Sequence, residues 1–159
     1  MATSQSRLHD TGAVQATIHW SLLVLTIFQA LSAVAGGIAI LTTNGLGMPA
    51  SMLANGPFDS FLWPGIILLI IMGGTQTIAA TLLRLHRQSA LVWCTIAGFG
   101  MIIWIFVETG IIGGTSWLQV LYFGTGALQL MLVLALLGIF DWLSAKSNAD
   151  SHRYPVKRS

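Results

Sequence analysis

The chain of 159 residues is 55% hydrophobic and only 8% charged, with seven basic and five acidic side chains. A soluble domain normally carries about 25% charged residues, so this composition excludes a water-soluble globular domain and favours a chain that lies in lipid. The basic residues are too few and too dispersed for a phosphate-binding face, so we expect no nucleic-acid partner. The single cysteine, Cys94, excludes an intramolecular disulfide and a Cys-x-x-Cys redox pair.

The apolar residues fall into four segments, each long enough to cross a hydrocarbon core of about 30 Å as a helix. In chain order, the predicted spans cover residues 14–41, 61–83, 90–112 and 117–140. A polar tail at 1–13 precedes them, and a polar, loosely ordered tail at 141–159 follows. We therefore predict an all-α four-helix transmembrane bundle in which consecutive spans are antiparallel neighbours.

The start of the first span also has features of a secretory signal peptide. Residues 20–29 would form its apolar core, and cleavage would follow the Ala-Val-Ala at 33–35. The apolar run continues to Leu41, however, which is longer than a signal core requires. We therefore expect this segment to remain in the protein as a span.

The connection between the first two spans, residues 42–60, is the longest of the three. Pro49 can open a short helix there, and Gly56 can end it. We predict a short amphipathic helix over residues 49–55, lying at the outer surface. Its apolar side would carry Met48, Met52 and Leu53.

All seven basic residues fall on one side of the predicted bundle. They are Arg7, Arg84, Arg87, Lys146, Arg153, Lys157 and Arg158. The connections on the opposite side, 42–60 and 113–116, contain no lysine or arginine. Because basic residues concentrate on the cytoplasmic side of a membrane protein, we expect both termini in the cytoplasm.

Polar side chains recur at helical spacing within the apolar segments. Gln15, His19, Thr26 and Gln29 share one stripe of the first span, and Gln129 lies on a similar line in the fourth. Amide and imidazole groups are costly in lipid and can form hydrogen bonds between helices. This polar stripe is therefore predicted to face the interior of the bundle and to join its helices.

His19 is the only histidine inside a predicted span, which invites a haem or metal interpretation. Haem held by two imidazoles would need a second histidine at matching depth, and a metal site would need three or four convergent ligands. His86, in the loop between the second and third spans, is the most suitable second histidine. We predict no haem, no metal and no catalytic residue, because the chain also lacks phosphate-loop, serine-hydrolase and metalloprotease motifs.

Two acidic residues lie on the side that has no basic residue. Asp59 stands at the start of the second span, and Glu108 stands late in the third. Carboxylates near aromatic faces suit a small cation or amine. The candidate ligand-binding residues are Asp59, Glu108, Trp63, Trp117, Gln119 and Tyr122. The alternative is that Asp59 caps its helix while Glu108 accepts hydrogen bonds from loop amides or water.

The segments GMPASMLANGPFDSFLWPG (47–65) and WIFVETGIIGGTSWLQVLYF (104–123) resemble those of small four-span bacterial membrane proteins that have no assigned activity. The resemblance extends over roughly residues 14–140 and implies a multi-pass protein of the bacterial cytoplasmic membrane. The chain is also similar to small multidrug transporters in having four short spans and one glutamate. Those transporters place the glutamate in the first span, whereas Glu108 lies late in the third.

Two functions remain open from the sequence. The first is a non-catalytic accessory or structural subunit that packs against partner helices or against copies of itself, because small-residue stripes suit helix contacts and no catalytic motif is present. The second is a small homo-oligomeric transporter or binder of a cation or amine that uses the acidic and aromatic residues named above.

Overall fold

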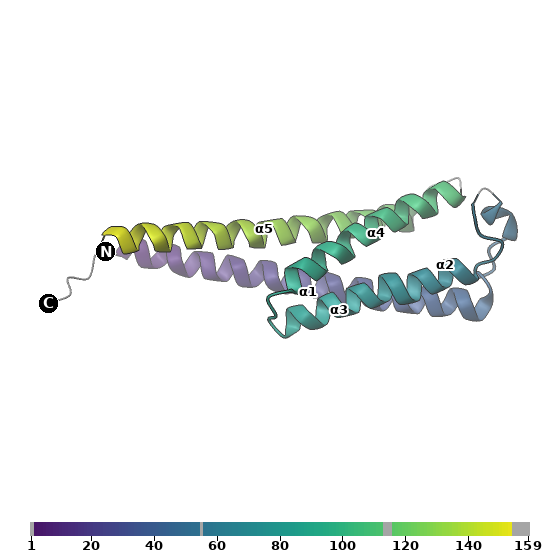
Figure 1. Cartoon of the computed structure of the whole chain (residues 1–159), viewed down its shortest axis with the longest axis horizontal. Coiled ribbons are helices and arrows are strands. Elements are labelled where there is room, and N and C mark those ends of the chain that lie inside the picture. The colour runs from purple at the N-terminus through teal and green to yellow at the C-terminus, as the bar shows by residue number, and fades with distance from the viewer. Residues whose placement is uncertain (1, 55, 113–115, 154–159) are drawn as a thin grey trace.

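The computed structural model describes residues 2–54, 56–112 and 116–153, with backbone alone for 2–11, 112 and 139–153. Within these ranges every regular element is helical. The elements are α1 (Ala2–Thr43), the 3-10 helix η1 (Ala50–Leu53), α2 (Leu62–Ile66), the π-helix η2 (Ile67–Met72), α3 (Gly73–Arg84), α4 (Ala90–Ile112) and α5 (Trp117–Arg153). Because α2, η2 and α3 follow one another without a break, they form a single rod (Figure 1).

The four rods form an antiparallel bundle, as predicted. α1 packs against α3 and α5, and α4 packs against the same two helices, so the helices form a closed ring. The segments long and apolar enough to cross a membrane are Gly12–Thr43, Leu62–Arg84, Ala90–Ile111 and Trp117–Gly138. Their ends lie within two residues of the predicted ends. The chain is thus a multi-pass membrane protein with an all-helical fold.

The two ends of the bundle differ in chemistry. We call the end with the α3–α4 loop, which contains Arg84 and Arg87, the basic end. We call the opposite end, which contains the connection from α1 to α2, the loop end. The first turns of α1 and the last turns of α5 lie beyond the basic end (Figure 1).

α1 and α5 are much longer than a membrane is thick. α1 has 42 residues, α5 has 37 and α4 has 23, which correspond to about 63, 55 and 35 Å of helix. Both long helices continue past the α3–α4 loop (Figure 1). We call these extensions, residues 2–11 of α1 and 139–153 of α5, the stalk.

The prediction of a loosely ordered C-terminal tail is therefore wrong as far as Arg153. Residues 139–153 contain neither glycine nor proline, so nothing in them interrupts the helix that begins at Trp117. Pro155 disfavours helical geometry in the residue before it, which agrees with a helix end at this point. The polar segment before the first span is likewise helical from Ala2.

The predicted short helix in the first connection is present, but it is a single 3-10 turn. Pro49, predicted as the first residue of this helix, instead precedes η1 as its N-cap with an extended backbone. Leu53 is buried against Phe61 and Ile111, and Met48 packs on the same cluster. The predicted end of this helix at Asn55 lies outside the described residues. The apolar side of the connection therefore covers the loop end of the bundle.

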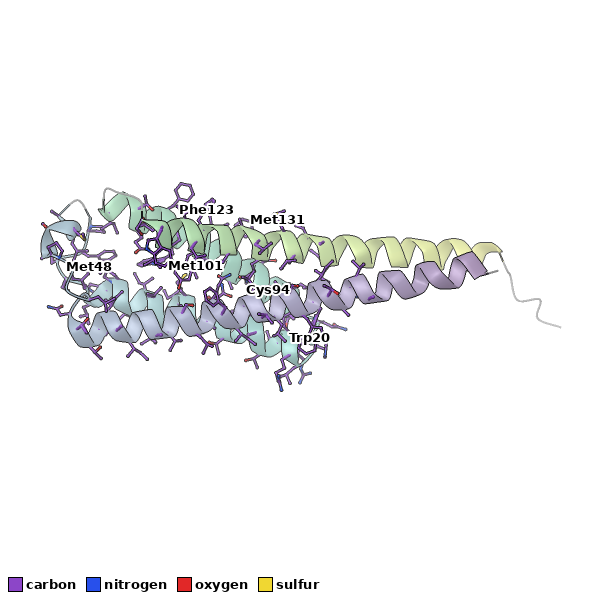
Figure 2. The ribbon with its side chains drawn as sticks, turned by 180° about the vertical axis from the view of Figure 1, so that it is seen from behind. Trp20, Met48, Cys94, Met101, Phe123 and Met131 are labelled. Atoms are coloured by element: carbon purple, nitrogen blue, oxygen red, sulfur yellow. The ribbon has the colours of Figure 1, made fainter. Side chains whose placement is uncertain are left out.

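Buried side chains form three layers along the bundle axis. The first, nearest the basic end, consists of Leu22, Leu23, Ala79, Leu83, Ala90, Cys94, Ala97, Val133 and Leu136. The second consists of Ala33, Met72, Met101, Trp104 and Ile105. The third consists of Leu53, Phe61 and Ile111. Figure 2 shows Cys94 and Met101 among the helices and Met48 at the loop end.

Glycines allow two close helix contacts. A Cβ on Gly37 would lie 2.8 Å from the backbone nitrogen of Leu69, so α1 and the wide π-helical turn of η2 touch through their backbones. A Cβ on Gly126 would lie 3.4 Å from the carbonyl oxygen of Gly98, where α4 and α5 meet. Small residues thus bring these helix pairs together, which is the usual arrangement for helices in lipid.

Candidate functional site

Three glutamine side chains meet at the centre of the bundle, between the first and second core layers. Gln29 of α1, Gln76 of α3 and Gln129 of α5 are all 0% exposed. The amide nitrogen of Gln76 donates to the side-chain oxygens of Gln29, at 2.8 Å, and of Gln129, at 3.2 Å. We call this group the glutamine centre.

The fourth helix takes part through its backbone. The amide nitrogen of Gln129 donates to the carbonyl oxygen of Cys94 at 2.8 Å, and that of Gln76 lies 3.4 Å from the carbonyl oxygen of Ala97. Hydrogen bonds between helices in lipid contribute about 0.6–2 kcal/mol each. The glutamine centre therefore joins all four rods and stabilises their packing.

Gln76 is the hub of this network. Its nitrogen faces three oxygen acceptors, so rotating the amide by half a turn would set its own oxygen against them. Two atoms, the nitrogen of Gln29 and the oxygen of Gln76, are buried and have no hydrogen-bond partner within the described part of the chain. The hydrogen bonds that Gln76 donates therefore depend on this orientation of its side-chain amide.

Sequence reasoning missed Gln76, although it named Gln29 and Gln129. Gln76 lies on no polar stripe of its own span, where its neighbours are small or apolar residues and threonines. The threonines bond the preceding turn of their own helix, as Thr77 does to the carbonyl of Gly73. The available signal was that three of the four spans carry one amide side chain near mid-depth.

The predicted polar stripe of the first span divides into two parts. Thr26 and Gln29 are fully buried, and the hydroxyl of Thr26 donates to the carbonyl oxygen of Leu22 at 2.6 Å. Gln15 and His19 lie closer to the basic end, are half-buried and line an open pocket. Only the deeper part of the stripe lies inside the bundle core.

Glu108 lies at the loop end, half-buried beside a small cavity of about 50 Å³. The other lining residues are Ile40, Met48, Met52, Leu53, Phe61, Pro64, Leu68, Trp104 and Ile111. A cavity of this size holds water or a single small ion, but it is too small for most organic amines, which occupy pockets of about 300 Å³ or more. Its walls are almost entirely apolar.

The other acidic and aromatic candidates do not line this cavity. Asp59, Trp63 and Trp117 are exposed, and none of them is among the residues around it. Trp117, at the start of α5, has 73% of its surface exposed. A joint site of Asp59 and Glu108 stays a prediction.

Gln119 and Tyr122 have structural contacts. The side-chain oxygen of Gln119 accepts a hydrogen bond of 2.8 Å from the backbone N–H of Ser116. Because Ser116 directly precedes α5, this bond is one half of a capping box. Tyr122 stacks on Phe28, with ring centroids 6.4 Å apart, and packs against the second core layer.

A larger pocket, of about 530 Å³, opens at the basic end. α1, the α3–α4 loop, the start of α4 and one residue of α5 line it. The lining residues are Gly12, Gln15, Ala16, His19, Trp20, Leu83, His86, Arg87, Gln88, Ala90, Leu91 and Leu136. We call it the basic-end pocket.

The structure brings together the two histidines that the sequence singled out. The rings of His19 and His86 stack with centroids 5.0 Å apart and planes inclined by 18°. Rings stacked face to face leave no space between them for a haem, whose iron takes one imidazole from each side. The described residues also contain no group of three or more histidine, cysteine or acidic side chains that could hold a metal ion.

His86 has a strained backbone. Its φ is +50°, in the left-handed region that favours glycine. Its N–H donates to the carbonyl of Leu83 at 3.1 Å, and the N–H of Arg87 donates to that of Leu82 at 3.0 Å. These two bonds define a Schellman motif at the end of α3, with histidine where glycine is usual. Strained positions of this kind are enriched at functional sites.

An apolar groove of about 800 Å³ lies between α1 and α5. Its lining residues are Ala16, Thr17, Trp20, Ser21, Val24, Leu25, Phe28, Leu128 and Leu132. Ala16 and Trp20 also line the basic-end pocket, so the groove and the pocket adjoin. Trp20, 61% exposed, stands at their border on the outside of the bundle (Figure 2). We call this surface the α1–α5 groove.

Comparisons with protein-family models, with curated proteins and with solved structures give no match to this chain.

Proposed function

We propose that the protein is a non-catalytic subunit of a membrane complex in a bacterial cytoplasmic membrane, with its termini and stalk in the cytoplasm. The observation that carries this proposal is the length of α1 and α5. Both exceed the roughly 30 Å of a hydrocarbon core by about 25 Å or more. Two adjacent helices that continue past the bundle give a partner protein an extended surface outside the lipid.

The composition of the stalk supports a surface exposed to water. Residues 2–11 and 139–153 contain the charged residues Arg7, Asp10, Asp141, Lys146, Asp150 and Arg153, whereas the spans contain only Arg84 and Glu108. Polar helices that project from a bundle are stabilised by side-chain pairs along their surfaces or by a partner. A soluble or membrane-bound partner that docks on the stalk would stabilise these polar helices.

The interior of the bundle supports a non-catalytic role. The buried amides of the glutamine centre bond one another and the backbone of α4, so they are not arranged for acid–base or nucleophilic chemistry. At the loop end, η1 packs over the third core layer. For transport of a cation or amine, the alternative from the sequence, the cavity beside Glu108 is small, at about 50 Å³.

Native mass spectrometry of the full chain purified in a mild detergent tests the subunit proposal. We expect a companion polypeptide in a fixed ratio. Truncation after Ser144 shortens the stalk but keeps all four spans, so it should release the companion without lowering the Tm of the bundle. The matched control is Ser51→Ala, in the exposed first connection.

Two results would contradict the proposal. Recovery of this polypeptide alone as a monomer, in every mild detergent tested, would remove the subunit role. Retention of the companion by the truncated chain would show that the spans, and not the stalk, carry the contact.

A further inference from the structure

We infer that the basic-end pocket and the α1–α5 groove form one binding site for an anionic phospholipid. The phosphate headgroup would lie in the pocket, and an acyl chain would lie in the groove. This inference concerns a ligand of the spans and is independent of the partner proposed for the stalk.

The polar lining of the pocket suits a phosphate group. It contains the guanidinium of Arg87, the imidazoles of His19 and His86, and the amides of Gln15 and Gln88. All of these can donate hydrogen bonds, and no acidic side chain is among the lining residues. Arginine binds phosphate oxygens with paired hydrogen bonds, and a volume of about 530 Å³ is ample for a headgroup.

The donors of the pocket are available to a ligand. None of the described residues forms a hydrogen bond with the imidazole of His19 or His86, or with the guanidinium of Arg87, whereas the glutamine centre bonds its amides internally. The left-handed backbone of His86 turns the chain at the end of α3, and the imidazole lies against His19. The strain is thus located at the residue that adds the second ring to the pocket.

The position along the bundle agrees with a lipid headgroup. The second candidate span ends at Arg84 and the third begins at Ala90, so the loop between them lies at the boundary of the hydrocarbon core. Trp20, on the border of the pocket, is of the residue type that favours this interface. Basic pockets between spans at the cytoplasmic face bind anionic headgroups.

The groove distinguishes a phospholipid from free phosphate. It runs along α1 from Ala16 to Phe28, about 18 Å of helix, which is comparable with one leaflet of a core of about 30 Å. Its walls are apolar except for Thr17 and Ser21. Because Ala16 and Trp20 belong to both surfaces, an acyl chain in the groove would connect directly to a headgroup in the pocket.

Lipid binding to the purified full chain tests the inference. The probes are phosphatidylglycerol, phosphatidylcholine and inorganic phosphate, each titrated against the delipidated protein in detergent, with bound lipid read by native mass spectrometry and Tm. We expect one phosphatidylglycerol per chain, bound at least about tenfold more tightly than phosphatidylcholine, and no Tm shift with inorganic phosphate.

Matched variants locate the two halves of the site. Arg87→Gln and His86→Gly should each weaken phosphatidylglycerol about tenfold, while Arg84→Gln, exposed in the same loop but outside the pocket lining, should bind as the native chain does. Val24→Trp fills the groove and should weaken both phospholipids.

Each contrary result has a defined meaning. Equal affinity for phosphatidylglycerol and phosphatidylcholine would overturn the headgroup assignment. A Tm shift with inorganic phosphate equal to that with phosphatidylglycerol would contradict the assignment of a lipid ligand and would indicate a free anion instead. Dimers lost in Val24→Trp, with no bound lipid, would assign the groove to a second copy of the chain.

Discussion

The glutamine centre and the basic-end pocket contain similar polar groups, yet their hydrogen bonds differ. At the centre, Gln76 donates to side chains of two other helices, and every glutamine is fully buried. At the basic end, His86 and Arg87 are exposed beside an open pocket, and no described residue bonds their side chains. Polar residues of one membrane protein therefore either join its helices or remain available to a ligand, and their hydrogen-bond partners separate the two cases.

The largest effect is expected at the hub of the centre. Gln76→Leu removes the donor that serves the side-chain oxygens of Gln29 and Gln129, and a buried polar group without a partner costs about 1–3 kcal/mol. We expect the free energy of unfolding to fall by about 2–4 kcal/mol. Unfolding in mixed detergent micelles measures this change.

Gln29→Leu is the matched control for that variant. The nitrogen of Gln29 already lacks a partner, and Gln76 keeps two other acceptors when Gln29 is removed. The control should therefore lose about 1 kcal/mol or less. Equal losses in the two variants would show that Gln76 is not the hub.

A smaller effect of opposite sign is expected at the basic end. Glycine adopts the left-handed backbone of His86 without the steric cost of a Cβ, which is about 1 kcal/mol. His86→Gly should therefore raise the free energy of unfolding by about 0.5–1 kcal/mol while it weakens lipid binding. Gln88→Gly, at a position without positive φ in the same loop, is the control and should lower stability. A less stable His86→Gly would mean that the stack on His19 contributes more than the strain costs.

The last prediction leaves stability unchanged and tests which side the pocket faces. Cys94 is fully buried in the first core layer, so it should not react with an impermeant thiol reagent. In intact cells, Ser51→Cys should be labelled from outside and Ser147→Cys should not. The reverse pattern would place the basic end outside the cytoplasm and separate it from the anionic leaflet that the lipid site requires.

The sequence was sufficient for the architecture because the length of an apolar span depends only on local composition. The four rods follow directly from the apolar runs, and η1 follows from Pro49. The helical stalk was missed because polar composition suggested a loose tail. The absence of glycine and proline from residues 139–153 was the better signal.

The sites were harder because they depend on how the rods rotate and pair. Gln76 becomes a hub only where α3 turns it toward α1 and α5 at matching depth, which its own segment does not encode. The sequence identifies His86 as the histidine best placed to pair with His19 in a haem site. The stacking of the two rings and the groove beside them, however, arise from tertiary packing. Glu108 is a candidate ligand-binding residue in the sequence because it is a charged residue in an apolar segment. In the structure it lines a small cavity of about 50 Å³.

The glutamine centre also constrains the order in which the protein assembles. Gln76 is 47 residues from Gln29 and 53 from Gln129 along the chain. Its bond to Gln29 can form once the second span has entered the membrane, whereas its bond to Gln129 needs the fourth. Until then, Gln76 lacks one of its two side-chain acceptors. Afterwards, turning α1, α3 or α5 by a single residue, about 100°, would point its amide away from the others. The centre thus acts as a check on the rotation of these three helices that is complete only when α5 is in place, and a chain that fails it keeps an unpaired polar group in the bilayer.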